Sequence, residues 1–124
     1  MAKKLLANNW QLIVVGRDAD KLQAAYGNSN LQIVVDCSTI TGAKRIFEAI
    51  QASDLTPTAL AHCVGNIRLG ALHRMSEVDI MDCMNANLIS AFHTLAGFTN
   101  YLKETKLCVF RRICVICRCA YWHA

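Results

Sequence analysis

The chain has 124 residues, 54% of them hydrophobic, with only six glycines and one proline. This size suits one domain, and this composition excludes a disordered or collagen-like chain. The formal net charge of +4 is not spread along the sequence: residues 1–107 carry ten basic against nine acidic residues, and three tail arginines supply the rest. No basic surface for nucleic acid is therefore expected.

A membrane-spanning helix needs about 18 consecutive apolar residues, and no run in this sequence is that long. The first residues, MAKKLLANNW, also lack the longer apolar core of a signal peptide. We therefore expect a cytoplasmic protein that does not bind membranes, whose seven cysteines stay as thiols in a reducing compartment.

The first half of the chain alternates apolar runs with helical patterns. AKKLLANNW resembles the last turns of a helix, and Gln11–Val15 is an apolar run typical of a buried strand. Asp18 can cap a helix that ends at Gly27, and Leu31–Asp36 predicts the next strand. This alternation is the pattern of an α/β domain with a parallel sheet.

The second half continues the pattern. Thr41 can cap the next helix, and residues 58–64 predict a third strand after Pro57. Ser76 and Asp79 have the spacing of a capping box at the start of a long helix. The apolar residues of that helix form one stripe, expected to be buried on the sheet: Met81, Met84, Leu88, Phe92 and Leu95. Leu107–Phe110 predicts a fourth strand.

These segments resemble, over residues 3–110, the short-chain dehydrogenase/reductase family of NAD(P)-dependent oxidoreductases. LIVVGRDADKL is similar to the family's second strand and the helix after it, and VVDCS to its third strand. The resemblance implies that Asp36 and the backbone of Cys37 lie against the adenine ring of the cofactor.

Two further segments carry the resemblance. AHCVGN stands where the family has Asn-Asn-Ala-Gly, with His62 and Cys63 in place of the two asparagines and with Val64 and Gly65 completing the cofactor-binding motif. MNANLISAF is similar to the family segment whose asparagine, here Asn87, bends the helix and helps to hold a water of the catalytic proton relay.

The form of the cofactor is indicated by the end of the first predicted strand. An acidic residue there binds the ribose 2′-OH of NAD, whereas an arginine suits the 2′-phosphate of NADP. Gly16 is followed by Arg17, so NADP is preferred and NAD is the alternative, which Asp18 and Asp20 favour.

Two motifs of the family are absent from the sequence. No Gly-rich turn precedes Gln11, and the tyrosines at 26, 101 and 121 lack a lysine four residues later. We therefore expect a partial Rossmann-type doubly wound parallel sheet that lacks its first strand and Gly-rich loop, truncated at both ends. In the order 3-2-1-4-5 the absent strand is central, so the sheet would divide into two halves with exposed apolar edges.

The tail, residues 111–124, combines arginines with cysteines. Cys114 and Cys117, with Cys108, Cys119 and His123, could bind zinc. A buried strand is a second interpretation, which the adjacent Arg111 and Arg112 oppose. A third interpretation, which we favour because it accounts for the arginines and the cysteines together, is a shifted reading frame after about residue 110. Codons from Phe110 onward, read from their second base with free third bases, can encode SAASVSFAAAHTGM, which resembles the family's strand that ends in small residues and the catalytic serine.

We therefore interpret residues 1–110 as a partial NAD(P)-binding domain and residues 111–124 as an aberrant tail. The function expected is that of a fragment of an oxidoreductase that moves a hydride between NADP(H) or NAD(H) and a carbonyl or alcohol substrate, with impaired cofactor binding and no turnover. A homo-oligomer is compatible with the family. The alternative is a non-enzymatic Cys-rich protein that binds metal or a partner.

Overall fold

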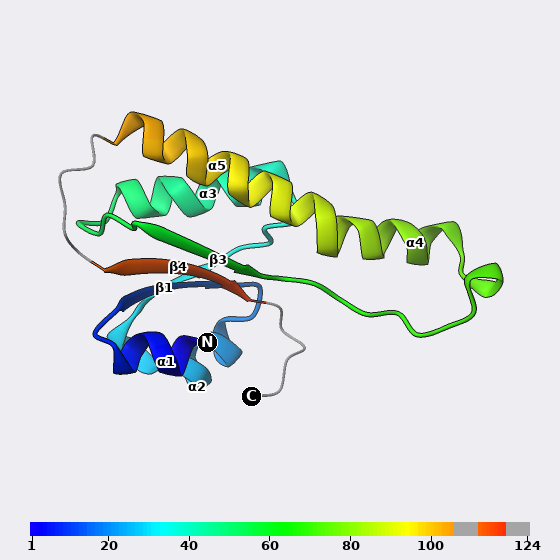
Figure 1. The fold of residues 1–124 in the computed structure, drawn as a ribbon, viewed down its shortest axis with the longest axis horizontal. Coiled ribbons are helices and arrows are strands. Elements are labelled where there is room, and N and C mark those ends of the chain that lie inside the picture. Colours follow the sequence, from blue (N-terminus) through cyan, green and yellow to red (C-terminus); the bar gives the residue numbers. More distant parts are fainter. Residues whose placement is uncertain (106–111, 119–124) are drawn as a thin grey trace.

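A parallel sheet with helices on both faces forms the body of the protein (Figure 1). The computed structural model describes residues 1–105 and 112–118. Within them, the sheet has four strands in the order β2-β1-β4-β3. The strands are β1 (Gln11–Gly16), β2 (Leu31–Val34), β3 (Ala59–Cys63) and β4 (Ile113–Arg118). The predicted α/β class, a partial Rossmann-type parallel sheet, is confirmed.

The helices form a layer on each side of this sheet (Figure 1). On one side lie α1 (Ala2–Ala7) and α2 (Ala19–Tyr26), followed by a 3₁₀ turn, η1 (Gly27–Ser29). On the other lie α3 (Ile40–Gln51) and a long helix made of α4 (Glu77–Met84), the π-helical turn η3 (Asn85–Ile89) and α5 (Ser90–Glu104). A second 3₁₀ turn, η2 (Leu72–Arg74), precedes α4. None of the helices in the described residues has the length and hydrophobicity needed to cross a bilayer.

Most of the local helix signals act as predicted. The Asp18 carboxylate accepts a hydrogen bond from the Lys21 N–H at 3.0 Å and so caps α2, while Gly27 ends that helix with φ of 58°. Ser76 and Asp79 form the predicted capping box of α4. The cap of α3 was predicted wrongly: Thr39, not Thr41, has the extended backbone and accepts the Gly42 N–H at 3.0 Å.

The centre of the sheet corrects the expectation that it would divide into two halves. β4 lies between β1 and β3 and is parallel to both, with Val15 opposite Cys117 on one side and Ala61 opposite Ile116 on the other. It holds the place of the central strand that the family order requires. A run that is apolar at nearly every position suits a strand buried on both faces, so six residues of the tail complete the sheet.

The two arginines that opposed a strand in the tail precede β4 rather than interrupt it. Arg112 is exposed, and its carbonyl accepts a hydrogen bond from the Gln11 N–H at 2.9 Å. Arg111 and the strand predicted at Leu107–Phe110 lie outside the described residues. The adjacent arginines are therefore compatible with a buried strand that begins after them, at Ile113.

Alternate side chains of β4 enter two hydrophobic cores. Ile113, Val115 and Cys117 pack in the core beneath α3 and α5, whereas Cys114 and Ile116 pack in the core beneath α1 and α2. All five are at most 3% exposed. This strand therefore joins the two helical layers through the sheet.

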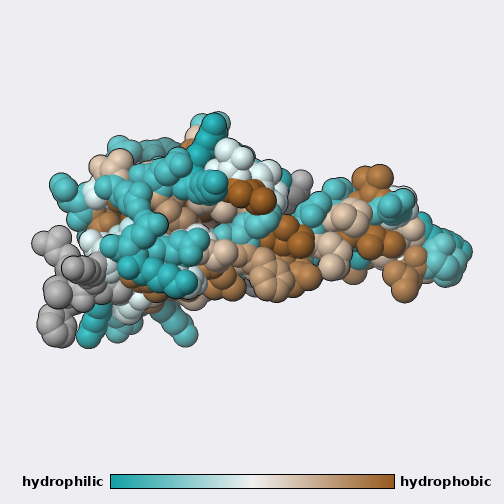
Figure 2. All heavy atoms as spheres, turned by 90° about the horizontal axis from the view of Figure 1, so that it is seen from above, coloured by the Kyte–Doolittle hydropathy of each residue, from teal (hydrophilic) through white to brown (hydrophobic). Residues whose placement is uncertain are grey.

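The apolar stripe of the long helix is not buried, contrary to the prediction. Its residues are 42% to 61% exposed, and Figure 2 shows apolar atoms along the projecting end of the molecule. The face that packs on the rest of the protein is made of small and polar residues, among them the buried Ser90, Thr94 and Tyr101. Periodicity correctly predicts a helix here, but it does not show which face packs on the protein. The small residues let the helix lie closer to α3 than the apolar stripe would allow, since a Cβ on Gly97 would lie 2.5 Å from the Phe47 ring.

Candidate functional site

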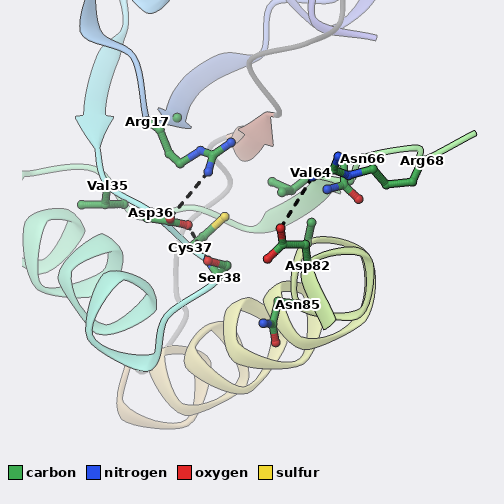
Figure 3. A pocket seen from close by; sticks show the side chains of 13 residues that line it. Arg17, Val35, Asp36, Cys37, Ser38, Val64, Asn66, Arg68, Asp82 and Asn85 are labelled. Carbon is green, nitrogen blue, oxygen red and sulfur yellow. Dashed lines mark hydrogen bonds and ion pairs between the residues drawn. The ribbon is translucent and has the colours of Figure 1, made fainter. Parts of the chain in front are cut away.

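A cavity of about 380 Å³ opens at the carboxyl edge of the sheet (Figure 3). Its walls come from the segments that follow β1, β2 and β3 and from the α4–η3 region of the long helix. The carboxyl edge of an open parallel sheet is where α/β proteins bind their ligands. The lining side chains are mostly polar, which suits a ligand with several hydrogen-bonding groups.

Every residue predicted to bind the cofactor lies on this cavity. Arg17 follows β1, Asp36 and Cys37 follow β2, and Val64 and Gly65 follow β3. Their role as cofactor-binding residues stays a prediction. The sequence did not predict a site role for the remaining lining residues, although several lie at or near the ends of predicted strands. They are Gly16, Val35, Ser38, Asn66, Arg68, Asp82, Asn85 and Ala86.

The Asp36 carboxylate is held in its charged form. Its Oδ1 accepts hydrogen bonds from the Ser38 N–H at 2.9 Å and the Ser38 hydroxyl at 2.7 Å. Partial burial raises the pKa of Asp36, but the bonds from Ser38 and the nearby Arg17 charge outweigh it, so the pKa lies below its usual value. A negative charge therefore persists at the wall of the cavity near neutral pH.

Arg17 is only loosely held beside it. Its guanidinium lies 3.7 Å from the Asp36 carboxylate, and 55% of its side chain is exposed. An exposed ion pair of this kind contributes little to stability, about 0–1 kcal/mol. Arg17 can therefore turn from Asp36 toward an anionic ligand at low cost.

Two glycines are required where backbone segments approach closely around the cavity. A Cβ on Gly42 would lie 1.8 Å from the Asp36 carbonyl oxygen, so only glycine lets α3 begin so close to the Asp36 segment. A Cβ on Gly65 would lie 2.5 Å from the Asn87 Oδ1. The segment after β3 therefore passes directly over the Asn87 side chain.

Asn87, predicted to be catalytic, lies beside the cavity rather than on its wall. It belongs to the π-helical turn η3, a local irregularity of the long helix. Its Nδ2 donates to the Asn66 carbonyl at 2.9 Å and the Cys83 carbonyl at 2.8 Å, while its Oδ1 accepts the Asn66 N–H at 3.1 Å. In this structure, Asn87 therefore fixes the segment that follows Gly65.

Ion pairs link the next part of that segment to the long helix. Arg68 lies 3.4 Å from the Asp79 carboxylate. It also lies 3.7 Å from the Asp82 carboxylate (Figure 3). The hydrogen bonds from Ser76, and after them the Arg68 charge, lower the pKa of Asp79. Arg68 is thus balanced by two carboxylates and adds little net positive charge to the cavity.

A histidine and a serine far apart in the sequence meet beneath the cavity. His62 Nε2 lies 3.1 Å from the Ser90 Oγ, and that hydroxyl donates to the Ala86 carbonyl at 2.6 Å. Burial lowers the pKa of His62, and Ser90 is completely buried. A substrate cannot reach this serine, so the pair serves to join β3 to the long helix.

The cysteines of the tail strand do not share a metal site. Residues three apart in a strand point to opposite faces, and Cys114 and Cys117 indeed lie in different cores. Among the described residues, no group of three or more His, Cys, Asp or Glu side chains could hold a metal ion. Cys108, Cys119 and His123 of the predicted zinc set lie outside the described residues.

The fold is similar to that of several solved structures. A short-chain dehydrogenase/reductase from Vibrio parahaemolyticus aligns with a TM-score of 0.71 and 21% identity, covering 94% of this chain and 52% of its own. A short-chain dehydrogenase from Streptomyces avermitilis aligns at 0.70 and 16%, covering 83% and 39%. An alcohol dehydrogenase from the archaeon Thermococcus sibiricus, complexed with 5-hydroxy-NADP, aligns at 0.63 and 19%, covering 84% and 47%. The chain thus spans about half the length of these proteins or less.

The parallel sheet and the cavity at its carboxyl edge define a Rossmann-type α/β protein. The sequence also matches the family described as short chain dehydrogenase over residues 1–108. The chain therefore belongs to the short-chain dehydrogenase/reductase family, as the motifs predicted. No curated protein is similar enough in sequence to serve as a relative.

Proposed function

We propose that this chain is the part of an NAD(P)-dependent oxidoreductase that binds the adenosine end of the cofactor, with NADP preferred. The observation that carries this proposal is the convergence of the residues after three strands, Arg17, Asp36–Cys37 and Val64–Gly65, on one cavity. When bound, the cofactor would exchange a hydride with a small carbonyl or alcohol substrate.

The charges around the end of β1 support NADP over NAD. Arg17 is half exposed and has one loose partner, so its guanidinium is available to a 2′-phosphate. Asp18, which would favour the 2′-OH of NAD, is engaged in capping α2 and lies 3.5 Å from the Lys21 ammonium. Neither Asp18 nor Asp20 is among the residues that line the cavity.

The rest of the cavity offers what an adenine ring requires. The Asp36 carboxylate and the backbone around Cys37 form one wall, and Val64 and Gly65 form another. An apolar side chain and a flat glycine backbone suit the face of an aromatic base, while a carboxylate can accept a hydrogen bond from its amino group. These residues therefore fit the adenosine end of the cofactor.

We further propose that these 124 residues bind the cofactor weakly and do not catalyse hydride transfer on their own. The sequence holds no Tyr-x-x-x-Lys pair, since position 30 is Asn and position 105 is Thr. A tyrosine needs the lysine charge nearby to transfer a proton near neutral pH. Asn87, with its side chain bound to Asn66, would position the segment after β3 against the cofactor.

Calorimetric titration with adenosine 2′,5′-bisphosphate and with adenosine 5′-monophosphate tests the proposal. The 2′-phosphate compound should bind more tightly, and Arg17→Ala should weaken its binding by roughly tenfold to a hundredfold, because a hydrogen bond between charged groups contributes about 1.5–3 kcal/mol. Arg45→Ala is the matched control, because Arg45 is exposed on α3 and does not line the cavity. Equal binding of both compounds, or an unchanged affinity in Arg17→Ala, would contradict the preference for NADP.

A further inference from the structure

The cavity wall carries one pair of opposite charges, Arg17 and Asp36, whose two members are held very differently. Arg17 follows β1 and Asp36 follows β2, and these strands are neighbours in the sheet. The guanidinium lies 3.7 Å from the Asp36 Oδ2, and Figure 3 shows the Arg17 side chain reaching toward Asp36. While no ligand is bound, each charge therefore partly neutralises the other.

Asp36 is the fixed member of the pair. Its Oδ1 accepts hydrogen bonds from both the N–H and the hydroxyl of Ser38, at 2.9 and 2.7 Å. Its backbone carbonyl accepts hydrogen bonds from the Thr39 hydroxyl at 3.1 Å and from the Thr39 N–H at 3.4 Å. These contacts hold Asp36 at the start of α3 and leave Oδ2 as the oxygen that faces Arg17.

Arg17 is the mobile member of the pair. Its side chain is exposed, and its distance of 3.7 Å from Asp36 is longer than a hydrogen bond. A phosphate would offer the guanidinium more charge and two parallel hydrogen bonds. A 2′-phosphate in the cavity can therefore take Arg17, but only by drawing it away from the carboxylate.

We propose that Asp36 is a specificity-determining residue, which competes with the 2′-phosphate of the cofactor for Arg17 and so reduces the preference for NADP over NAD. This inference rests on the proposed function, since it takes the ligand to be the adenosine end of the cofactor. With a ligand that has only a 2′-OH, Arg17 stays beside Asp36 and its charge remains balanced. The pair thus admits both forms of the cofactor.

The competition has a limited magnitude. An exposed ion pair changes an equilibrium constant by at most about fivefold. Asp36→Asn removes the carboxylate charge, while the Asn side chain can still accept the Ser38 N–H. We expect the affinity for adenosine 2′,5′-bisphosphate, divided by the affinity for adenosine 5′-monophosphate, to rise about three- to fivefold in Asp36→Asn.

Calorimetric titration of the full chain with both compounds tests this competition. The proteins compared are the unmodified chain, Asp36→Asn, Arg17→Ala and the double variant. Both compounds carry the same adenine, so a change at the adenine contact cancels in the affinity ratio. The ratio should rise in Asp36→Asn, but Asp36→Asn should change it by less than about twofold when Arg17 is already alanine, because the effect acts through Arg17.

Asp20→Asn is the matched control. It removes the same charge three residues from Arg17, at an exposed position that does not line the cavity, and should leave the ratio unchanged. Asp36→Ser, which also keeps an acceptor for the Ser38 N–H, makes the same comparison if Asp36→Asn does not fold.

The outcomes separate this inference from the proposed function. The inference alone is overturned if Asp36→Asn leaves the ratio unchanged or lowers it, if Asp20→Asn raises it equally, or if the rise is the same without Arg17. A ratio that Arg17→Ala leaves unchanged would overturn the proposed preference for NADP and this inference with it. Binding of neither compound to the unmodified chain would overturn the proposed function as well.

Discussion

Shortening Val115 to alanine measures how much the central position of β4 contributes to the stability of the protein. Val115 is completely buried between β1 and β3, in the core beneath α3 and α5. Val115→Ala removes two methyl groups, worth about 0.8 kcal/mol each in transfer from water, and leaves a cavity in a sheet that is held on both sides. We expect the free energy of unfolding to fall by about 2–3 kcal/mol.

Urea unfolding followed by far-ultraviolet circular dichroism measures this change. The matched control is Val78→Ala on α4, where the same side chain is 68% exposed and the same substitution should change the free energy of unfolding by less than about 0.5 kcal/mol. Against a typical stability of about 5–15 kcal/mol, the loss at Val115 is easily resolved. If Val115→Ala and Val78→Ala unfold at the same urea concentration, β4 is not in the core.

Two further substitutions test the contacts beneath the cavity. Burial lowers the pKa of His62, so the unfolded chain binds a proton more readily and the free energy of unfolding should decline as pH falls below about 6.5. In urea unfolding at several pH values, His62→Asn should flatten this part of the stability profile. An unchanged slope would contradict the burial of the ring. Gly65→Ala should lower the free energy of unfolding by about 1–3 kcal/mol, because the new methyl group would overlap the Asn87 Oδ1. Gly70→Ala should cost far less, because no atom lies within 4 Å of a Cβ at that position. Equal losses in the two variants would contradict the close contact.

Local signals in the sequence predicted the elements that depend on neighbouring residues. The cap at Asp18, the φ of Gly27 and the capping box at Ser76 each involve residues within a few positions of one another. The strands around Val15 and Ile33 follow from apolar runs that are long enough to be buried. Such features are set by the chain next to them, so a single sequence shows them.

The position of β4 could not be predicted in the same way. Its composition indicates a buried strand, but its place between β1 and β3 depends on pairings with residues about half or more of the chain away, such as Val15 and Ala61. The exposure of the apolar stripe on the long helix also depends on packing between distant segments, which a single sequence does not show. Periodicity shows that Leu88 and Phe92 share a face, whereas the packing of Ser90 and Thr94 decides which face the protein covers.

The sequence predicted residues that line the candidate cavity but not the contacts that support them. Arg17, Asp36 and Gly65 stand at or just beyond the ends of predicted strands, where a parallel sheet gathers its binding residues. The contact between His62 and Ser90 leaves no local pattern, because the two residues belong to segments that are brought together only when the long helix packs on the sheet.

Nuclear magnetic resonance titration of the ¹⁵N-labelled chain with adenosine 2′,5′-bisphosphate locates the binding site most directly. If the cavity binds the adenosine end of NADP, saturable shifts should appear in the amides of Arg17, Asp36–Ser38 and Gly65–Asn66. The amides of α1, on the far side of the sheet from α3 and α5, should not move. Shifts confined to other surfaces, or no saturable shift at all, would contradict the assignment of this cavity to the cofactor.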